Sequence, residues 1–219
     1  MKKNTIIIFI AVVCLVFISF ASRPIDQHKK ISPERIHRFE RQEVIVEDFD
    51  AEGYILDIGG GGEGVIGQLK GEQVIAIDIS KQELEEAPPG PLKIVMDARD
   101  MKFIDNSFNT VTVFFTFMYI KNYDHQKVLE EVFRVLVPGG RLLIWDGIFP
   151  ERIDEKKDVA LFLLKVKLPK KEIDAGYGVQ WPEKEQGVLH YVELAKKVGF
   201  EVVVQKEKDQ WFFLELKKI

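Results

Sequence analysis

Short apolar runs recur through the middle of the chain at the spacing of strands, and mixed polar stretches separate them. Five of these runs predict buried strands: residues 54–58, 73–78, 92–96, 109–117 and 141–146. The fourth run is continuously apolar and β-branched, which is typical of a central strand covered on both faces. We therefore expect the core of the molecule to be a largely parallel sheet.

Helix signals fill the gaps between these runs. Ser80-Lys-Gln-Glu83 is a capping box that begins a helix, and Pro88-Pro89 ends it. Asp124 begins a second helix, in which the apolar residues Val128, Val132 and Val135 recur at helical spacing. The alternation of strand and helix predicts an α/β domain over residues 51–219 with right-handed crossovers between parallel strands.

The rhythm breaks after the fifth run and then resumes. Residues 147–183 contain two partly alternating stretches, 162–168 and 173–181, which predict an inserted hairpin on the substrate side. A helix follows over residues 185–198, ended by Gly199. Two further strands, 200–205 and 210–217, predict a closing antiparallel hairpin at the C-terminus.

Residues 1–22 form a separate segment. Lys2 and Lys3 precede an uncharged run over residues 4–22, whose 19 positions span roughly 28 Å as a helix, against about 30 Å for a bilayer core. Basic residues from Arg23 to Arg41 outnumber the two before the run, which favours a transmembrane anchor with the following domain in the cytoplasm. The alternative is a signal peptide cleaved after Ser19-Phe-Ala21, which exports the protein.

Residues 23–50 carry many charges and link the anchor to the domain. Ser32 followed by Pro33 can begin a helix, because Ser caps helices and Pro suits the first helical position. This segment is interpreted either as a helical lid over the site or as a solvated linker.

Composition narrows the function classes. The 219 residues are 46% hydrophobic, enough for one substantial core. A net charge of −4 and a pI near 5.7 argue against a nucleic-acid surface. The one cysteine, Cys14, excludes an internal disulfide and a cysteine-built metal site, and no metal is expected.

The chemistry concentrates where the predicted strands end. The first run leads from Asp57 into the glycines of residues 59–62, and glycines let a backbone approach a ligand closely before a helix N-terminus. The second run ends in Asp78, 21 residues beyond Asp57, and the third leads into Asp97. Such spacing places acids at the carboxyl edge of a parallel sheet, where nucleotide-like ligands bind.

These residues resemble an ordered family signature. Asp57-x-Gly59-x-Gly61, Asp78, Asp97-Ala98 and the Pro138-Gly139-Gly140 turn look like the class I S-adenosylmethionine-dependent methyltransferases, with a methyltransferase type 11-like domain. The resemblance implies a Rossmann-like, doubly wound, mostly parallel seven-stranded sheet. One departure is Glu63, which stands where many members have a third glycine.

The resemblance also implies residue roles. Asp78 is expected to accept hydrogen bonds from the ribose hydroxyls of S-adenosylmethionine. Asp97 is expected to accept a hydrogen bond from the adenine amino group. The expected cofactor-binding residues are Asp57, Gly59, Gly60, Gly61, Gly62, Asp78, Ile79, Asp97, Ala98 and Phe115. In this set Ile79 and Phe115 are the candidates to sandwich the adenine.

Candidates for contact with the methyl acceptor come from strand ends. Tyr119 follows the fourth run and Asp146 ends the fifth, so both are expected catalytic residues. His190 is expected to be solvent-exposed, and neither it nor His125, in the first turn of its helix, is expected to be catalytic. The acceptor is expected to be a small molecule or a lipid. Its nucleophilic atom is expected to attack the sulfonium methyl group in line, and the sulfur leaves as a neutral thioether.

Two other interpretations share part of the pattern. An NAD-dependent oxidoreductase shares the glycine turn and Asp78, but it does not predict Asp97-Ala98 or the Pro-Gly-Gly turn. A membrane-tethered protein that binds S-adenosylmethionine without catalysis keeps all the binding residues. Transfer of a methyl group to any acceptor separates this second alternative from the enzyme.

Overall fold

The computed structural model describes residues 31–152 and 154–219. The predicted anchor or signal segment, residues 1–22, lies outside these described residues. Within the described part, no helix has both the length and the apolar character needed to cross a bilayer. The described residues comprise the domain and the segment directly before it.

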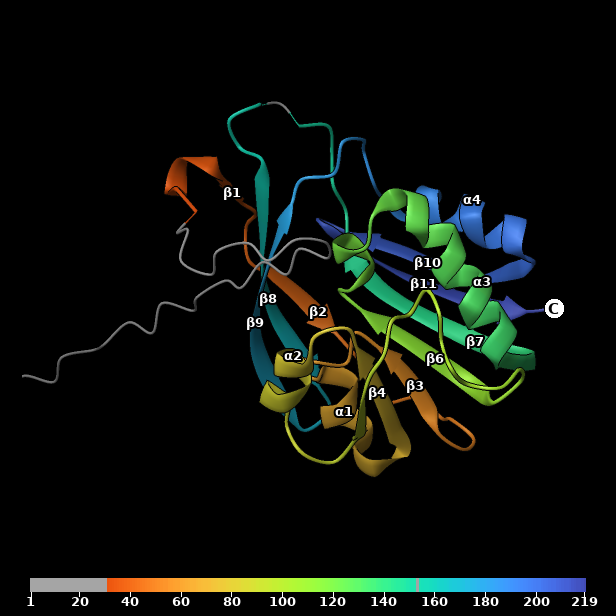
Figure 1. Cartoon of the computed structure of the whole chain (residues 1–219). Coiled ribbons are helices and arrows are strands. Elements are labelled where there is room, and N and C mark those ends of the chain that lie inside the picture. Colours follow the sequence, from red (N-terminus) through yellow and green to blue (C-terminus); the bar gives the residue numbers. More distant parts are fainter. Residues whose placement is uncertain (1–30, 153) are drawn as a thin grey trace, which may run out of the picture.

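A seven-stranded mixed sheet forms the centre of the domain, in the order β10-β11-β7-β6-β3-β4-β5 (Figure 1). Its strands are β3 (Ile55–Ile58), β4 (Val74–Asp78), β5 (Leu92–Val95), β6 (Phe108–Phe114), β7 (Leu136–Gly147), β10 (Phe200–Lys208) and β11 (Trp211–Lys218). The first five pair in parallel, whereas β11 is antiparallel to both β7 and β10. The expected mostly parallel sheet with a C-terminal antiparallel hairpin is confirmed.

Two long helices cover one face of this sheet. Helices α3 (His125–Val135) and α4 (Val188–Val198) lie side by side in Figure 1. The buried residues Val128 and Val132 of α3 share one hydrophobic cluster with Tyr191 of α4 and with Leu56 and Val111 of the sheet. The helical spacing predicted for α3 therefore marks its core-facing side.

Local signals define the shorter helices. The Ser80 hydroxyl accepts a hydrogen bond from the Glu83 N–H at 3.3 Å, so the predicted capping box begins α2 (Lys81–Glu86). Helix α1 (Val65–Lys70) follows the glycine loop, and Gly199 ends α4 with φ of +113°. Val65 and Ile66 of α1 are buried against the opposite face of the sheet.

A second, four-stranded sheet packs beside α1 on that opposite face. It contains β1 (Ile36–Arg38), β2 (Gln42–Ile45), β8 (Val159–Leu168) and β9 (Lys171–Gln180). Strands β8 and β9 form the antiparallel hairpin expected within residues 147–183. Strands β1 and β2 both pair in parallel with β8. Its inner face joins the main core through buried residues such as Val44, Phe162 and Leu164.

The helix expected to begin at Ser32 is wrong. Residues Pro33–Arg35 form a single 3₁₀ turn, and β1 and β2 follow it. Gln42, Val44 and Val46 are buried while Glu43 and Ile45 between them are not, which is the period of a strand. Pairing with β8, more than 100 residues away in sequence, overrides the local helix signal.

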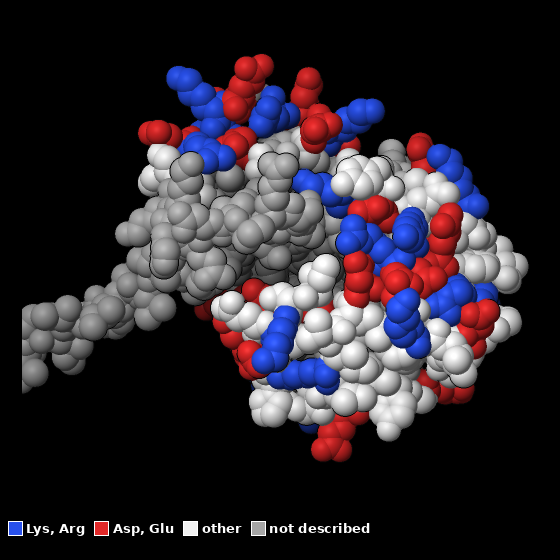
Figure 2. Space-filling view, in the orientation of Figure 1, with Lys and Arg blue, Asp and Glu red and all other residues white. Residues whose placement is uncertain are grey.

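Charged side chains of both signs share the surface. Figure 2 shows acidic and basic groups next to one another over the face that carries α3. Ion pairs such as Lys102–Asp100 at 2.6 Å and Arg134–Asp105 at 2.8 Å account for part of this mixing. Exposed pairs of this kind add little stability, so the fold depends mainly on its two hydrophobic clusters.

Candidate active site

A large cleft lies at the carboxyl ends of β3, β4, β5 and β6, and β9 of the second sheet lines its other side. Its volume is about 2080 Å³. This exceeds the roughly 300–1,000 Å³ of a typical small-ligand pocket, so the cleft has room for two ligands together. Both sheets therefore contribute walls to one site.

The glycine loop after β3 packs too tightly for side chains. A Cβ atom on Gly59 would overlap the Thr116 side chain, and one on Gly60 would lie 2.7 Å from Asp57 Oδ2. A Cβ on Gly61 would lie 2.5 Å from Glu83 Cβ and 2.9 Å from Asp78 Oδ2. The glycines thus keep the loop against β4 and α2 while leaving the cleft side open.

The amides of the glycine loop form hydrogen bonds within the protein. Gly59 and Gly60 N–H both donate to the Ile77 carbonyl, at 2.8 and 3.1 Å. Gly62 N–H donates to the Glu83 carbonyl at 2.8 Å, and the Gly61 N–H faces the Asp78 carboxylate. A ligand on this loop meets bare backbone rather than a set of free donors.

Asp57 lies beneath the loop. Its side chain is 2% exposed, and Oδ1 accepts a hydrogen bond from Thr112 Oγ1 at 2.7 Å. Burial raises the pKa of Asp57 to about 7, the Thr112 hydrogen bond opposes this, and the nearby Asp78 charge adds to it. The carboxyl is therefore held by β6 directly against Gly60 of the loop.

Asp78 ends β4 at the edge of the cleft. Its Oδ1 accepts a hydrogen bond from Ser80 N–H at 2.8 Å. Burial raises the pKa of Asp78, while backbone N–H groups of Ser80, Gly61 and Ile79 oppose the rise. The neighbouring Ile79 side chain is 53% exposed and lines the cleft. An apolar side chain left this exposed beside a carboxylate suits the edge of a nucleoside pocket.

Asp97 and Ala98 line the cleft beyond β5, as predicted. The sequence reasoning missed Arg99, whose guanidinium is ion-paired with Asp97 at 2.7 Å and with Asp124 at 2.8 Å. The hydrogen bonds from Arg99 lower the pKa of Asp97. Arg99 directly follows the Asp97-Ala98 pair in the sequence, and this adjacency is the one sequence feature that could have predicted the ion pair.

Phe115 does not occupy the position expected of an adenine-stacking residue. Its ring is 1% exposed, and its backbone has φ of +48°. The ring stacks on Tyr177 of β9, with centroids 5.4 Å apart and 13° between the planes. The left-handed backbone turns the ring toward the second sheet, where it fills the interface between the sheets.

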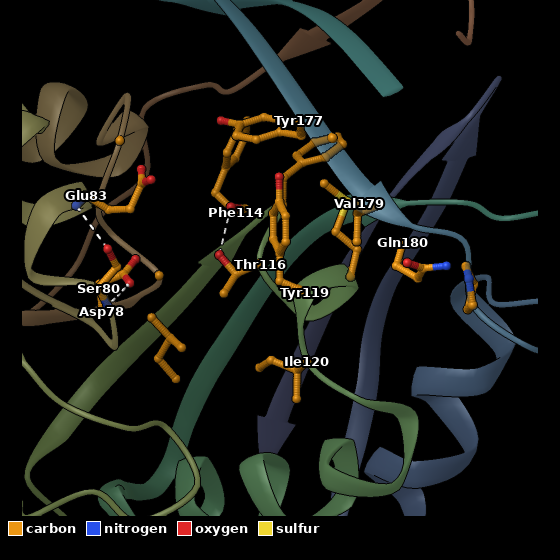
Figure 3. A pocket seen from close by; sticks show the side chains of 18 of the residues that line it. Asp78, Ser80, Glu83, Phe114, Thr116, Tyr119, Ile120, Tyr177, Val179 and Gln180 are labelled. Atoms are coloured by element: carbon orange, nitrogen blue, oxygen red, sulfur yellow. Dashed lines mark hydrogen bonds between the residues drawn. The ribbon is translucent and has the colours of Figure 1, made fainter. Parts of the chain in front are cut away.

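Two tyrosines define the wall opposite the acids. Figure 3 shows Tyr119 and Tyr177 on one side of the pocket and Asp78 and Glu83 on the other. The Tyr177 hydroxyl donates a hydrogen bond to the Glu63 carboxylate, and burial raises the Tyr177 pKa well above its usual range. Tyr119 was predicted, whereas Tyr177 was missed because its place depends on how β9 packs.

Asp146, the second expected catalytic residue, does not line the cleft. Its side chain is fully buried, and Oδ1 accepts a hydrogen bond from Gly147 N–H at 2.8 Å. Burial raises its pKa to about 7, opposed by backbone N–H groups of Gly147 and of residues 116–118. Asp146 therefore supports the η3 turn (Phe117–Tyr119) from behind.

His190, expected at the surface, is partly buried against His125, which lies in the core. His125 is fully buried, and its Nε2 lies 3.0 Å from the carbonyl oxygens of both Phe117 and Ile120. Two acceptors at Nε2 require a proton there, so Nδ1 accepts from His190 Nε2, 2.9 Å away. Burial lowers the pKa of His125 to about 4. The histidine pair thus holds the carbonyl groups of Phe117 and Ile120, which flank Tyr119.

Comparison with known proteins agrees with this geometry. Residues 56–144 match the family model described as a methyltransferase domain. The chain is 32% identical over 131 residues to the ubiquinone/menaquinone biosynthesis C-methyltransferase UbiE of Pseudoalteromonas translucida, covering 53% of this chain and 51% of that protein. It is 32% identical over 87 residues to the mitochondrial 2-methoxy-6-polyprenyl-1,4-benzoquinol methylase of Xenopus laevis, covering 35% and 27%. The chain thus spans about half the length, or less, of these curated relatives.

Solved structures share the fold. A SAM-dependent methyltransferase of Methanosarcina mazei has a TM-score of 0.53 at 20% identity, over 78% of this chain and 94% of that one. A phosphoethanolamine N-methyltransferase of Haemonchus contortus, solved with S-adenosyl-L-methionine, has a TM-score of 0.54 at 20% identity. The match covers 78% of this chain and 50% of that one. At this identity the likeness concerns the architecture alone.

Proposed function

We propose that the chain is a class I S-adenosylmethionine-dependent methyltransferase, which transfers a methyl group from that cofactor to a small-molecule or lipid acceptor. One observation carries the proposal. Asp57 in β3, Asp78 at the end of β4 and Asp97 after β5 place three carboxylates along adjacent parallel strands. Asp57 and Asp78 lie against a glycine loop with no room for side chains. A nucleoside with a charged amino-acid tail fits this combination of acids and bare backbone.

The residues present fit the cofactor. Asp78 would bind the ribose, since its two carboxylate oxygens match two vicinal hydroxyls and retain free lone pairs beside the Ser80 hydrogen bond. Asp97 and the Ala98 N–H would bind the adenine edge, and the exposed Ile79 would cover one face of the ring. The loop over residues 59–62 would lie against the methionine portion.

When bound, S-adenosylmethionine supplies a methyl group already activated by a sulfonium, so an in-line displacement needs little further chemistry. The work of the chain is then to hold the acceptor in line and to exclude water, and proximity and orientation supply most of the acceleration. Tyr119 and Tyr177 form the wall at which an acceptor would be held. Glu63, hydrogen-bonded to Tyr177, is the carboxylate available to receive an acceptor proton.

The lining of the second sheet supports an apolar acceptor. Leu161 and Leu163 of β8, Val179 of β9 and Trp181 line the cleft, and three of these four side chains are buried. The relatives are named for C-methylation in ubiquinone and menaquinone biosynthesis and of a polyprenyl benzoquinol. We extend the proposal to a cytoplasmic domain held at a membrane through residues 4–22, which would place a lipid acceptor within reach.

Transfer of labelled methyl groups tests the proposal. The full chain is incubated with methyl-labelled S-adenosylmethionine and with separate lipid and aqueous extracts of cells. We expect label in a product of one extract, and we expect Asp78→Ala to abolish it. The exposed Asp105 lies outside the cleft, so Asp105→Ala serves as the matched control and should retain activity. Cofactor binding without transfer to either extract would contradict catalysis and favour the non-catalytic binding protein.

A further inference from the structure

Arg99 joins two parts of the cleft wall that are distant in sequence. Its Nε lies 3.0 and 3.1 Å from the two carboxylate oxygens of Asp97, and its Nη2 lies 2.7 Å from Asp97 Oδ2. On the other side, Nη1 donates to Asp124 Oδ2 at 2.8 Å. Asp97, Arg99 and Asp124 all line the cleft. One planar guanidinium therefore holds both carboxylates.

The fork geometry fixes the Asp97 carboxylate in one orientation. The backbone N–H of Arg99 donates to Asp97 Oδ1 at 2.9 Å, which restrains the same side chain a second time. Arg99 keeps the pKa of Asp97 low, even though burial acts in the opposite direction. Because an ionised carboxylate only accepts hydrogen bonds, Asp97 attracts a donor and repels a carbonyl oxygen.

Asp97 remains accessible to a ligand despite this pairing. Its side chain is 35% exposed, and each carboxylate oxygen has more than one lone pair. The Arg99 side chain is 36% exposed, so the pair lies at the wall of the cleft and not beneath it. Partly exposed ion pairs contribute little to folding stability, so this arrangement needs another explanation.

Resting on the methyl-donor site proposed above, we propose that Arg99 is a positioning residue that makes this pocket select a 6-amino purine over its 6-oxo counterpart. Arg99 orients the Asp97 carboxylate toward the exocyclic amino group. Its second contact, to Asp124 at the start of α3, anchors the guanidinium so that it does not turn into the cleft. Without the Arg99 guanidinium, the Asp97 carboxylate would be free to rotate away from the amino group, and the pocket would lose the fixed acceptor that distinguishes the two purines.

The test compares S-adenosylhomocysteine with S-inosylhomocysteine, which differ at position 6, amino against oxo, and at N1, a bare acceptor against an N–H. The backbone N–H of Ala98 is the same in every variant, so a change of preference between variants reports the Asp97 carboxylate and not the contact at N1. Titration calorimetry on the full chain gives both affinities for the unmodified protein, Arg99→Gln and Arg99→Lys. The control is Lys102→Gln, since Lys102 forms an exposed pair with Asp100, with side chains 70% and 68% exposed. Thermal unfolding of each variant verifies that it folds.

We expect the unmodified chain and Lys102→Gln to prefer the adenosyl compound by at least about tenfold. Arg99→Gln should lose most of that preference at an unchanged unfolding temperature, and Arg99→Lys should retain part of it. An unchanged ratio in an Arg99→Gln protein that still binds S-adenosylhomocysteine would overturn the role of Arg99 alone. Absence of binding by the unmodified chain would overturn the methyl-donor site itself and, with it, this role.

Discussion

Replacing Asp57 by Asn removes a buried charge while preserving the shape of the side chain. The carboxyl is 2% exposed, and its Oδ1 accepts the Thr112 hydroxyl at 2.7 Å. An amide oxygen accepts the same hydrogen bond. A difference in the free energy of unfolding that varies with pH therefore reports the ionisation of Asp57 together with its coupling to the nearby Asp78.

The sign and size follow from the pKa of this group. Burial raises the pKa of Asp57 from 3.8 to about 7 in the folded protein, whereas the unfolded chain keeps the ordinary value. Between these two values the folded state holds a proton that the unfolded state has lost, so stability falls as pH rises. At 1.36 kcal/mol for each pKa unit, the loss is on the order of 4 kcal/mol, complete above pH 7 and absent below about pH 4.

Urea unfolding of the unmodified chain and of Asp57→Asn across pH 4 to pH 8 measures this effect. The titrating Asp146 and His125 occur in both proteins, so their contributions cancel in the difference. We expect Asp57→Asn to gain stability relative to the unmodified chain as pH rises, by up to about 4 kcal/mol. A difference that does not change with pH, or a variant that is less stable at pH 8, would refute the reasoning.

Three further predictions concern the walls around the cleft. Gly61→Ala places a Cβ 2.5 Å from Glu83 Cβ and should weaken S-adenosylhomocysteine binding at least about tenfold in calorimetry. Gly187→Ala, outside the cleft and with the nearest neighbour of its Cβ at 3.7 Å, should bind normally, and equal losses in both would contradict the packing argument. Asp146→Asn should gain stability relative to the unmodified chain as pH rises from about 4 to about 7, because burial raises the pKa of Asp146 from 3.8 to about 7 in the folded protein. It should keep its affinity for S-adenosylhomocysteine, because Asp146 lies outside the cleft, and a loss of affinity would place it in the site. Leu164→Ala in the second sheet should lower the free energy of unfolding by about 2–5 kcal/mol in urea, and a cost near zero would mean that this sheet does not share the core.

Local signals predicted the parts of the site that depend on one segment of chain. Asp57, Asp78 and Asp97 each follow an apolar run, and runs of this kind become parallel strands whose ends share an edge. The capping box at Ser80 and the glycine at 199 also act within a few residues. Such features could be predicted from the sequence because neighbouring residues determine them.

Contacts between distant segments could not be predicted in this way. His125 and His190 are 65 residues apart, and their pairing follows from how α3 and α4 pack together. Tyr177 enters the site only because β9 lies across the cleft from the acids. Asp146 ends its strand as predicted, yet the η3 turn covers it, so the position at a strand end did not establish contact with the cleft.

In the segment before the domain, a local helix signal competes with strand pairing to a distant part of the chain. A Ser-Pro pair predicts a helix start from local propensity, but the alternating burial of Gln42, Val44 and Val46 matches a strand. Both signals are present in the sequence. The presence of β8 as a partner decided between them, since an edge strand is stable only when it has a neighbour to pair with.

Titration calorimetry of the full chain with S-adenosylhomocysteine, and separately with NADH, tests the central claim most directly. We predict micromolar binding of S-adenosylhomocysteine, about −8 kcal/mol, and no heat with NADH. Asp78→Ala should weaken this binding at least about tenfold, whereas Asp105→Ala, outside the cleft, should not. Binding of NADH, or failure to bind either compound, would contradict the assignment of this cleft to a methyl-donor cofactor.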